Sequence, residues 1–144
     1  MLKMGIIDKE RWPLPTRESW VQDWDTIDHK PWRIRNQAIY AAMVDHMDQA
    51  VGNIINALKR TKQFENTLII YFHDNGACPE HLSGNGWNTA NNILAKAKRE
   101  GKEVAVGDKY DVMMGGPLTY GSVGHNWANA QNTPMRRYKS NVHN

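Results

Sequence analysis

The sequence predicts an α/β fold in which a long amphipathic helix packs on a buried strand, and two features of the chain lead to this prediction. Apolar residues recur at helical spacing from Arg35 to about Thr61. After a short polar loop, Thr67–Phe72 forms a run of β-branched, aliphatic and aromatic residues. A helix that leads through a short loop into a buried strand is the repeating step of layered α/β domains.

The helical region has an apolar stripe along one side. Its members are Ile39, Tyr40, Met43, Met47, Val51, Ile54, Ile55 and Leu58. Lys59 and Arg60 follow in the last turns, where positive charge stabilises the negative end of the helix dipole. Asp45 and Asp48 lie on the other side, and we interpret them as part of a solvated helix face rather than as metal ligands.

The run Thr67–Phe72 is continuously apolar and is entered through the polar pair Glu65-Asn66. Strands that are buried on both faces of a parallel sheet have this composition, so we expect a buried strand here. The rest of the chain is dominated by long irregular loops. Within them, a short helix is expected over residues 91–100 and a brief strand over 104–106.

Composition describes a folded chain and excludes several classes of protein. The 144 residues suffice for one domain or a piece of one, and 40% hydrophobic with 23% charged residues is typical of globular rather than disordered chains. The net charge of +3 is scattered without a basic stripe, so nucleic-acid binding is not indicated. No membrane span is expected, because no stretch approaches the roughly 18 apolar residues that one needs. Asp8 and Glu10 lie where the apolar core of a signal peptide would be, so we expect no signal peptide in this chain.

Residues 1–35 are expected to form an irregular lead-in to the main body, 36–144. This lead-in contains prolines, many charges and three tryptophans: Trp12, Trp20 and Trp24. Tryptophan buries a large apolar ring and usually serves as a packing anchor. We therefore expect these residues to pin the lead-in to the surface of the main body.

Polar groups gather where the predicted strand ends, at Asp74-Asn75-Gly76. In open α/β sheets, ligands bind outside the carboxyl ends of the strands. A carboxylate beside an amide oxygen suits a hard cation such as Ca²⁺ or Mg²⁺. Asp-Asn-Gly is also a common turn sequence, because Asn and Gly accept positive φ. The residues by themselves leave a metal site and a simple turn as alternatives.

Histidines and the cysteine near this junction do not predict a zinc site. His73, Cys78 and His81 lie close in sequence, but their spacing matches no usual structural zinc pattern. His73 is a candidate for orienting a metal ligand. His125 and His143 belong to loops that can reach the same cleft or face solvent.

Several separated motifs together resemble the later part of an arylsulfatase catalytic domain. They are Tyr40–Asp48, Asn66–Phe72 running into Asp74–Cys78, and Trp127–Ala130 with Asn132–Pro134 and Tyr138-Lys139. Their order and spacing agree with the family across most of residues 36–144. The resemblance implies a partial alkaline-phosphatase-like α/β sandwich, in which 36–144 is the C-terminal portion of the catalytic domain.

The resemblance also implies roles for individual residues. In this family an Asp and the Asn that follows it, before a Gly, are ligands of Ca²⁺, and they match Asp74 and Asn75. A lysine shortly before a His-Glu-Gly-Gly turn binds the sulfate, and Lys139 matches it, with His143 four residues later. Asn144 stands where the family commonly has Glu. We expect Asp74, Asn75 and Lys139 to face one cleft.

The family's nucleophile is a formylglycine made from Cys or Ser in a Cys/Ser-x-Pro-Ser-Arg motif, and this chain contains no such motif. Cys78 precedes Pro79 and Glu80, so we interpret it as a small packed residue. The acidic metal ligands that the family supplies near its N-terminus are also missing. The resemblance therefore implies a fragment of a sulfatase that acts on a sulfate-ester small molecule or glycan, with the remainder of the catalytic domain as its partner.

Two alternatives stay open at this stage. One is a related metal-dependent phosphodiesterase or phosphonate hydrolase of the same superfamily, and the other is a non-catalytic binding domain with the same fold. Because members of the family are usually exported, the resemblance implies a periplasmic or extracellular location.

Overall fold

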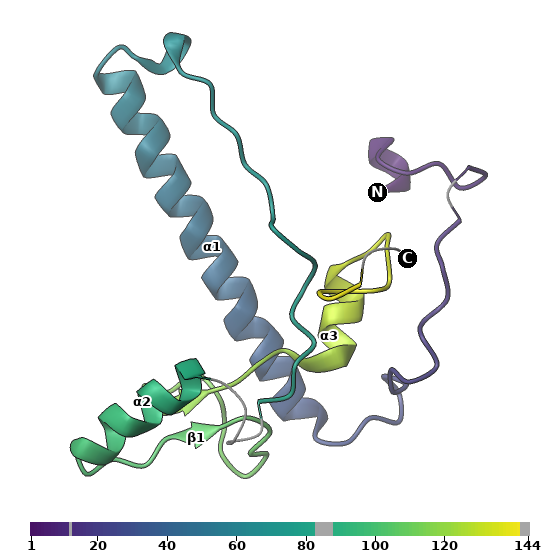
Figure 1. Cartoon of the computed structure of the whole chain (residues 1–144). Coiled ribbons are helices and arrows are strands. Elements are labelled where there is room, and N and C mark those ends of the chain that lie inside the picture. The colour runs from purple at the N-terminus through teal and green to yellow at the C-terminus, as the bar shows by residue number, and fades with distance from the viewer. Residues whose placement is uncertain (12, 83–87, 142–144) are drawn as a thin grey trace.

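The long helix α1, Lys30–Arg60, dominates the computed structural model, which describes residues 1–11, 13–82 and 88–141 (Figure 1). It confirms the predicted helix and begins earlier than Arg35. Pro31 lies in its first turn, where a missing N–H leaves no hydrogen bond unmade. Asp45 and Asp48 are exposed, as predicted for a solvated face.

The other elements are short. In chain order they are the 3₁₀ helices Leu2–Met4 and Phe64–Asn66, α2 (Asn88–Arg99), β1 (Ala105–Val106), β2 (Thr119–Tyr120) and α3 (Gly124–Gln131). Helix α2 and strand β1 confirm the short helix and the brief strand that the sequence predicts. Strands β1 and β2 form a parallel two-stranded sheet in which Ala105 pairs with Thr119 and Val106 with Tyr120. A small core of Leu82, Ala97, Val104 and Val106 includes one residue of this sheet, with Leu94 and Tyr120 packed against it.

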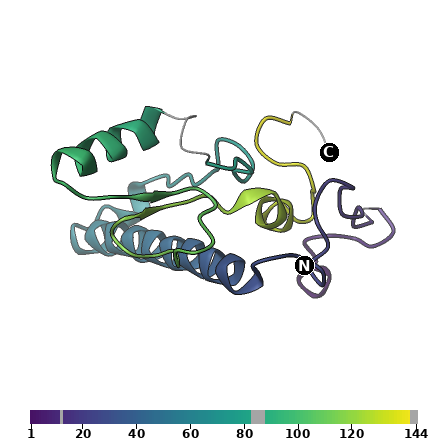
Figure 2. The same ribbon diagram turned by 90° about the horizontal axis from the view of Figure 1, so that it is seen from below.

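The first turns of α1 hold the later loops in place. Trp32 is buried and donates a hydrogen bond from Nε1 to the carbonyl of Val112, at 3.0 Å. Trp127 of α3 donates from Nε1 to the carbonyl of Arg33, at 2.9 Å. Buried Asn36 donates to the carbonyl of Ser122. This end of α1 is therefore the point where helix α3 and the loops 107–123 are anchored (Figure 2).

The lead-in is tied to the end of the chain, as its tryptophans predict. Trp20 donates a hydrogen bond to the hydroxyl of Tyr138, at 3.0 Å. The Trp24 ring lies 4.9 Å from that of Trp127, centroid to centroid. Trp12 lies outside the described residues. The later part of the lead-in thus packs against α3 and the segment that follows it, while α1 extends away from them (Figure 1).

The prediction that Thr67–Phe72 forms a buried, paired strand is wrong. The segment is extended, but within the described ranges it pairs with no other strand. Leu68, Ile70 and Phe72 are 85%, 70% and 77% exposed. A strand is buried only when neighbouring strands and covering helices exist, and the described part of the chain supplies neither for this segment. The described residues form a mixed α/β structure of three α-helices and a two-stranded sheet, and the expected sandwich is not seen among them.

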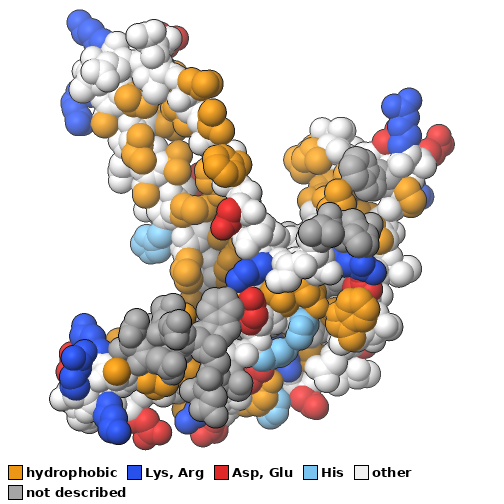
Figure 3. Space-filling model, in the orientation of Figure 1, with side chains coloured by type: hydrophobic (Ala, Val, Ile, Leu, Met, Phe, Trp, Pro, Cys, Tyr) orange, Lys and Arg blue, Asp and Glu red, His pale blue; other side chains and the backbone are white. Residues whose placement is uncertain are grey.

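Helix α1 also leaves much of its apolar stripe uncovered. Met43 and Ile54 are 64% and 62% exposed. The Tyr71 hydroxyl of the extended segment donates a hydrogen bond to the sulfur of Met47, at 3.9 Å. Figure 3 shows hydrophobic side chains along this arm of the molecule. None of the described helices combines the length and apolar character that crossing a bilayer needs.

Candidate functional site

The Asp74-Asn75-Gly76 turn is held against the C-terminal segment by backbone contacts. The amide of Lys139 donates to the carbonyl of Ala77 at 3.1 Å, and the amide of Ala77 donates to Oδ1 of Asn132 at 3.2 Å. A Cβ added to Gly76 would lie 3.0 Å from the backbone nitrogen of Lys139. Only glycine allows this approach without displacing the neighbouring backbone. The turn and Lys139 therefore lie side by side.

Asp74, Asn75 and Lys139 all line one cavity of about 950 Å³. Asn36 of α1 and Ser122 also line this cavity. The three predicted site residues therefore share one hollow, as expected, although Lys139 is distant from the others in sequence. Their roles as metal ligands and sulfate-binding residue stay predictions.

The Asp74 and Asn75 side chains are in direct contact. Nδ2 of Asn75 donates to Oδ1 of Asp74 at 2.7 Å, and both residues are exposed. A carboxylate and an amide oxygen fit part of the shell of a hard cation, which takes roughly six to eight oxygens as Ca²⁺. No group of three or more His, Cys, Asp or Glu side chains able to hold a metal occurs within the described ranges. These residues thus fit one side of a coordination shell whose other oxygens must come from elsewhere.

The ammonium of Lys139 is 3.2 Å from Oε1 of Glu80. The other carboxylate oxygen of Glu80 accepts a hydrogen bond from the Cys78 thiol. This thiol hydrogen bond is the largest cause of a lowered pKa for Glu80, and Lys139 lowers that pKa further. Burial, followed by the contact with Glu80, raises the pKa of Cys78. Cys78 is therefore a protonated hydrogen-bond donor at neutral pH rather than a nucleophilic thiolate.

Lys139 belongs to a cluster of basic residues with Arg136 and Arg137, and these two arginines contact a different part of the chain. Nε of Arg136 donates to the carbonyl of Pro15 at 2.8 Å, and Nε of Arg137 lies 3.1 Å from Oε1 of Glu18. Both arginines thus contact the lead-in. Lys139 lines the cavity, whereas Arg136 and Arg137 do not.

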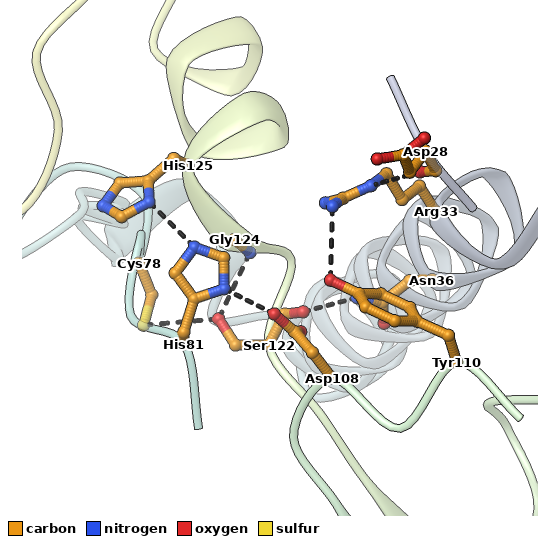
Figure 4. A network of polar contacts seen from close by, with 10 residues as sticks. All are labelled: Asp28, Arg33, Asn36, Cys78, His81, Asp108, Tyr110, Ser122, Gly124 and His125. Atoms are coloured by element: carbon orange, nitrogen blue, oxygen red, sulfur yellow. Dashed lines mark hydrogen bonds and ion pairs between the residues drawn. The ribbon is translucent and has the colours of Figure 1, made fainter. Parts of the chain in front are cut away.

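Histidines near the site form a network that sequence patterns did not predict (Figure 4). Nδ1 of His81 lies 2.6 Å from Oδ2 of Asp108, and Nε2 of His81 lies 2.9 Å from Nδ1 of His125. Burial, followed by the charge of His81, lowers the pKa of His125. No sequence pattern identified Asp108 as a partner of these histidines, because it lies in an irregular loop distant in sequence from both of them. His125 reaches His81 rather than the cavity wall.

Of the other two histidines considered as site residues, only His73 lies in the part of the chain that the structure describes. His73 lines the cavity, and its Nε2 lies 3.2 Å from the Tyr71 hydroxyl. Its proposed part in orienting a metal ligand stays a prediction. His143 and Asn144 lie outside the described residues.

Comparison with known proteins assigns the chain to a family. A model of the sulfatase family matches residues 9–135. The chain therefore belongs to the sulfatase family, and the resemblance to arylsulfatases is confirmed. No solved structure gives a significant match.

Individual relatives agree with this assignment. The chain is 28% identical over 142 residues to an arylsulfatase of Klebsiella aerogenes. The matched region covers 94% of this chain and 26% of that protein. It is 34% identical over 76 residues to an uncharacterized sulfatase of Schizosaccharomyces pombe, covering 51% of this chain and 14% of that one. It is 42% identical over 52 residues to arylsulfatase J of Mus musculus, covering 36% and 8%. The chain thus spans about a quarter of the length of the Klebsiella relative.

Proposed function

We propose that this chain is the downstream portion of the catalytic domain of an enzyme that hydrolyses sulfate esters. In this proposal Asp74 and Asn75 supply oxygen ligands to a divalent cation, calcium, and Lys139 binds the sulfuryl group. The observation that carries the proposal is the single cavity of about 950 Å³ that these three residues line. Close contact of Gly76 and Ala77 with Lys139 brings the turn and this lysine side by side at the cavity.

The charges at this cavity suit the reaction. Hydrolysis of a sulfate ester develops negative charge on the leaving oxygen and holds it on the sulfuryl oxygens. An ammonium placed against those oxygens stabilises this charge, and lysine does so as a compact point charge. The carboxylate of Asp74 holds a cation near the same oxygens, and Asn75 adds a neutral donor. When bound, the cation supplies further stabilisation of negative oxygen as a Lewis acid.

Other parts of the enzyme complete the site in this proposal. The formylglycine nucleophile and the remaining acidic ligands come from sequence outside this chain. The ligands in this chain make up only about half of a coordination shell. The binding free energy that they supply does not offset the free-energy cost of ordering the site around the ion. We therefore expect the 144-residue chain by itself to bind calcium weakly and to hydrolyse no sulfate ester.

The first prediction tests the two proposed roles in the longer enzyme. Asp74→Asn should weaken calcium binding, measured by isothermal titration calorimetry, by at least about tenfold, because a charged ligand is lost. Lys139→Met should lower kcat/KM for p-nitrophenyl sulfate by about 100-fold or more, because the removed charge stabilises the transition state.

Matched controls come from exposed residues away from the cavity. Asp45→Asn removes a carboxylate from the solvated face of α1, where it accepts a hydrogen bond from Gln49. Lys102→Met removes the ammonium of an exposed pair with Glu100. Neither control should change calcium binding or activity. Calcium affinity unaltered by Asp74→Asn, or hydrolysis unaltered by Lys139→Met, would contradict the proposal.

A further inference from the structure

Glu80 contacts the ammonium of Lys139 without forming part of the cavity wall. Oε1 of Glu80 lies 3.2 Å from Nζ of Lys139, and the two side chains are 25% and 29% exposed. Lys139 and Cys78 are among the described residues that line the cavity, whereas Glu80 is not. Glu80 therefore contacts Lys139 without itself lining the cavity. Any effect it has on a bound anion must pass through the lysine or through its charge.

The carboxylate of Glu80 is itself held in place. Its second oxygen accepts a hydrogen bond from the Cys78 thiol, and Cys78 also lies 3.9 Å, sulfur to oxygen, from the Ser122 hydroxyl. Since the thiol hydrogen bond and Lys139 both lower the pKa of Glu80, the carboxylate stays ionised near neutral pH. The chain thus places a fixed negative charge beside the proposed sulfate-binding lysine.

Lys139 is consequently constrained at both ends. Its backbone amide donates to the carbonyl of Ala77, and its ammonium contacts Glu80 on the same segment. A free lysine side chain samples many rotamers, and restraining it before the reaction removes an entropic cost from the catalytic step. The same carboxylate reduces the net positive charge that a free anion meets.

We propose that Glu80 is a positioning residue, which fixes the Lys139 ammonium for the transition state and weakens its hold on free sulfate. This inference rests on the proposed function of Lys139. Glu80 thus favours catalysis, because it fixes the ammonium of Lys139, and opposes the binding of free sulfate, because it offsets the positive charge of that ammonium. A residue that only supports the fold would not separate them, because loss of structure weakens both together.

The test is Glu80→Gln in the longer enzyme, with p-nitrophenyl sulfate as substrate and inorganic sulfate as competitive inhibitor. We expect kcat to fall about tenfold, because the lysine is no longer held in one orientation. We expect the Ki for sulfate to fall about two- to fivefold, the effect of removing a partly exposed charge partner. The control is Glu100→Gln, which removes the carboxylate of the exposed pair with Lys102 and should change neither constant.

A second readout does not depend on activity. Burial is the largest cause of the raised pKa of Cys78, and the hydrogen bond to the Glu80 carboxylate raises this pKa further. Glu80→Gln should therefore speed the alkylation of Cys78 by iodoacetamide at neutral pH, which peptide mass spectrometry measures. This measurement checks the contact between Glu80 and Cys78, on which the fixed position of the carboxylate depends.

Each outcome decides for or against the inference. A lower kcat with a lower Ki and faster alkylation supports it. An unchanged kcat, an unchanged or higher Ki, or an unchanged alkylation rate overturns it. If Lys139→Met abolishes hydrolysis while Glu80→Gln has no effect, this inference alone fails. If Lys139→Met has no effect, the proposed function fails first.

Discussion

At the scale of single residues, Gly76 explains why the proposed ligands lie beside Lys139. Its Cα faces the backbone of the C-terminal segment so closely that a Cβ would lie 3.1 Å from the carbonyl carbon of Tyr138 and 3.0 Å from Oδ1 of Asn132. Backbone atoms move aside less easily than a flexible side chain. The glycine of the Asp-Asn-Gly turn therefore favours this close contact between segments, in addition to any role in turn formation.

Gly76→Ala should therefore destabilise the protein by about 1–3 kcal/mol, the usual cost of forcing extra volume into a packed contact. Urea denaturation of the longer enzyme measures this change. Gly52→Ala is the matched control, because a Cβ there meets nothing within 4 Å and the residue lies within α1. Replacing a helical glycine with alanine should instead stabilise the protein by about 0.5–1 kcal/mol. Equal effects of the two substitutions would contradict the close contact at Gly76.

His125 makes stability depend on pH. Burial and the neighbouring His81 lower its pKa in the folded state, so the unfolded chain binds the proton more readily. The free energy of unfolding should be greatest above the ordinary histidine pKa of about 6.5 and should fall as the pH drops from there through the lowered pKa. Asp108 and Glu80 lie close enough to oppose part of this shift.

His125→Gln should flatten this pH dependence, measured as the difference in unfolding free energy between mildly alkaline and mildly acidic buffer. His46→Gln, on the exposed face of α1, is the control and should leave the difference unchanged. Histidine NMR titration reports the shift directly. A pKa of His125 at or above its ordinary value would contradict the prediction.

At the scale of elements, the extended segment Thr67–Phe72 has the sequence of a buried strand without its surroundings. Its side chains are apolar on both sides, and Leu68 is 85% exposed. Within the described part of the chain, no backbone hydrogen bond is made by residues 68–73. Exposed apolar surface of this kind marks a place where other protein packs. We predict that the uncovered stripe of α1, including Met43 and Ile54, is covered by protein in the same way.

We predict that residues 68–72 pair with strands of the longer enzyme. Their amides should exchange slowly with deuterium there and quickly in the 144-residue chain alone. The middle of α1 is the internal control, because its hydrogen bonds are made within the helix and should protect it in both samples. Fast exchange of 68–72 in the longer enzyme would show that the segment is not a strand.

At the scale of the whole molecule, the structure is open rather than layered. The lead-in, α3 and the C-terminal segment gather around the first turns of α1, and the rest of that helix extends away from them with its apolar stripe exposed (Figures 1 and 3). The chain spans 26% of the Klebsiella arylsulfatase. An open arrangement with uncovered apolar surface is what a portion of a larger core should show, since burial requires the layers on either side.

The sequence by itself determined the elements whose causes are local. Apolar periodicity predicted α1, and the motif order predicted the sulfatase family. The resemblance also named Asp74, Asn75 and Lys139, which are found around one cavity. Local spacing is enough for a helix because its hydrogen bonds close within the same segment.

Only the tertiary structure decided the contacts between distant segments. The burial expected for Thr67–Phe72 failed because strand pairing depends on partners that the described chain does not supply. The link from Cys78 through Glu80 to Lys139, and the network of Asp108, His81 and His125, join residues with no shared sequence pattern. Such contacts arise from how loops fold onto α1 and α3, and local sequence carries little information about that packing.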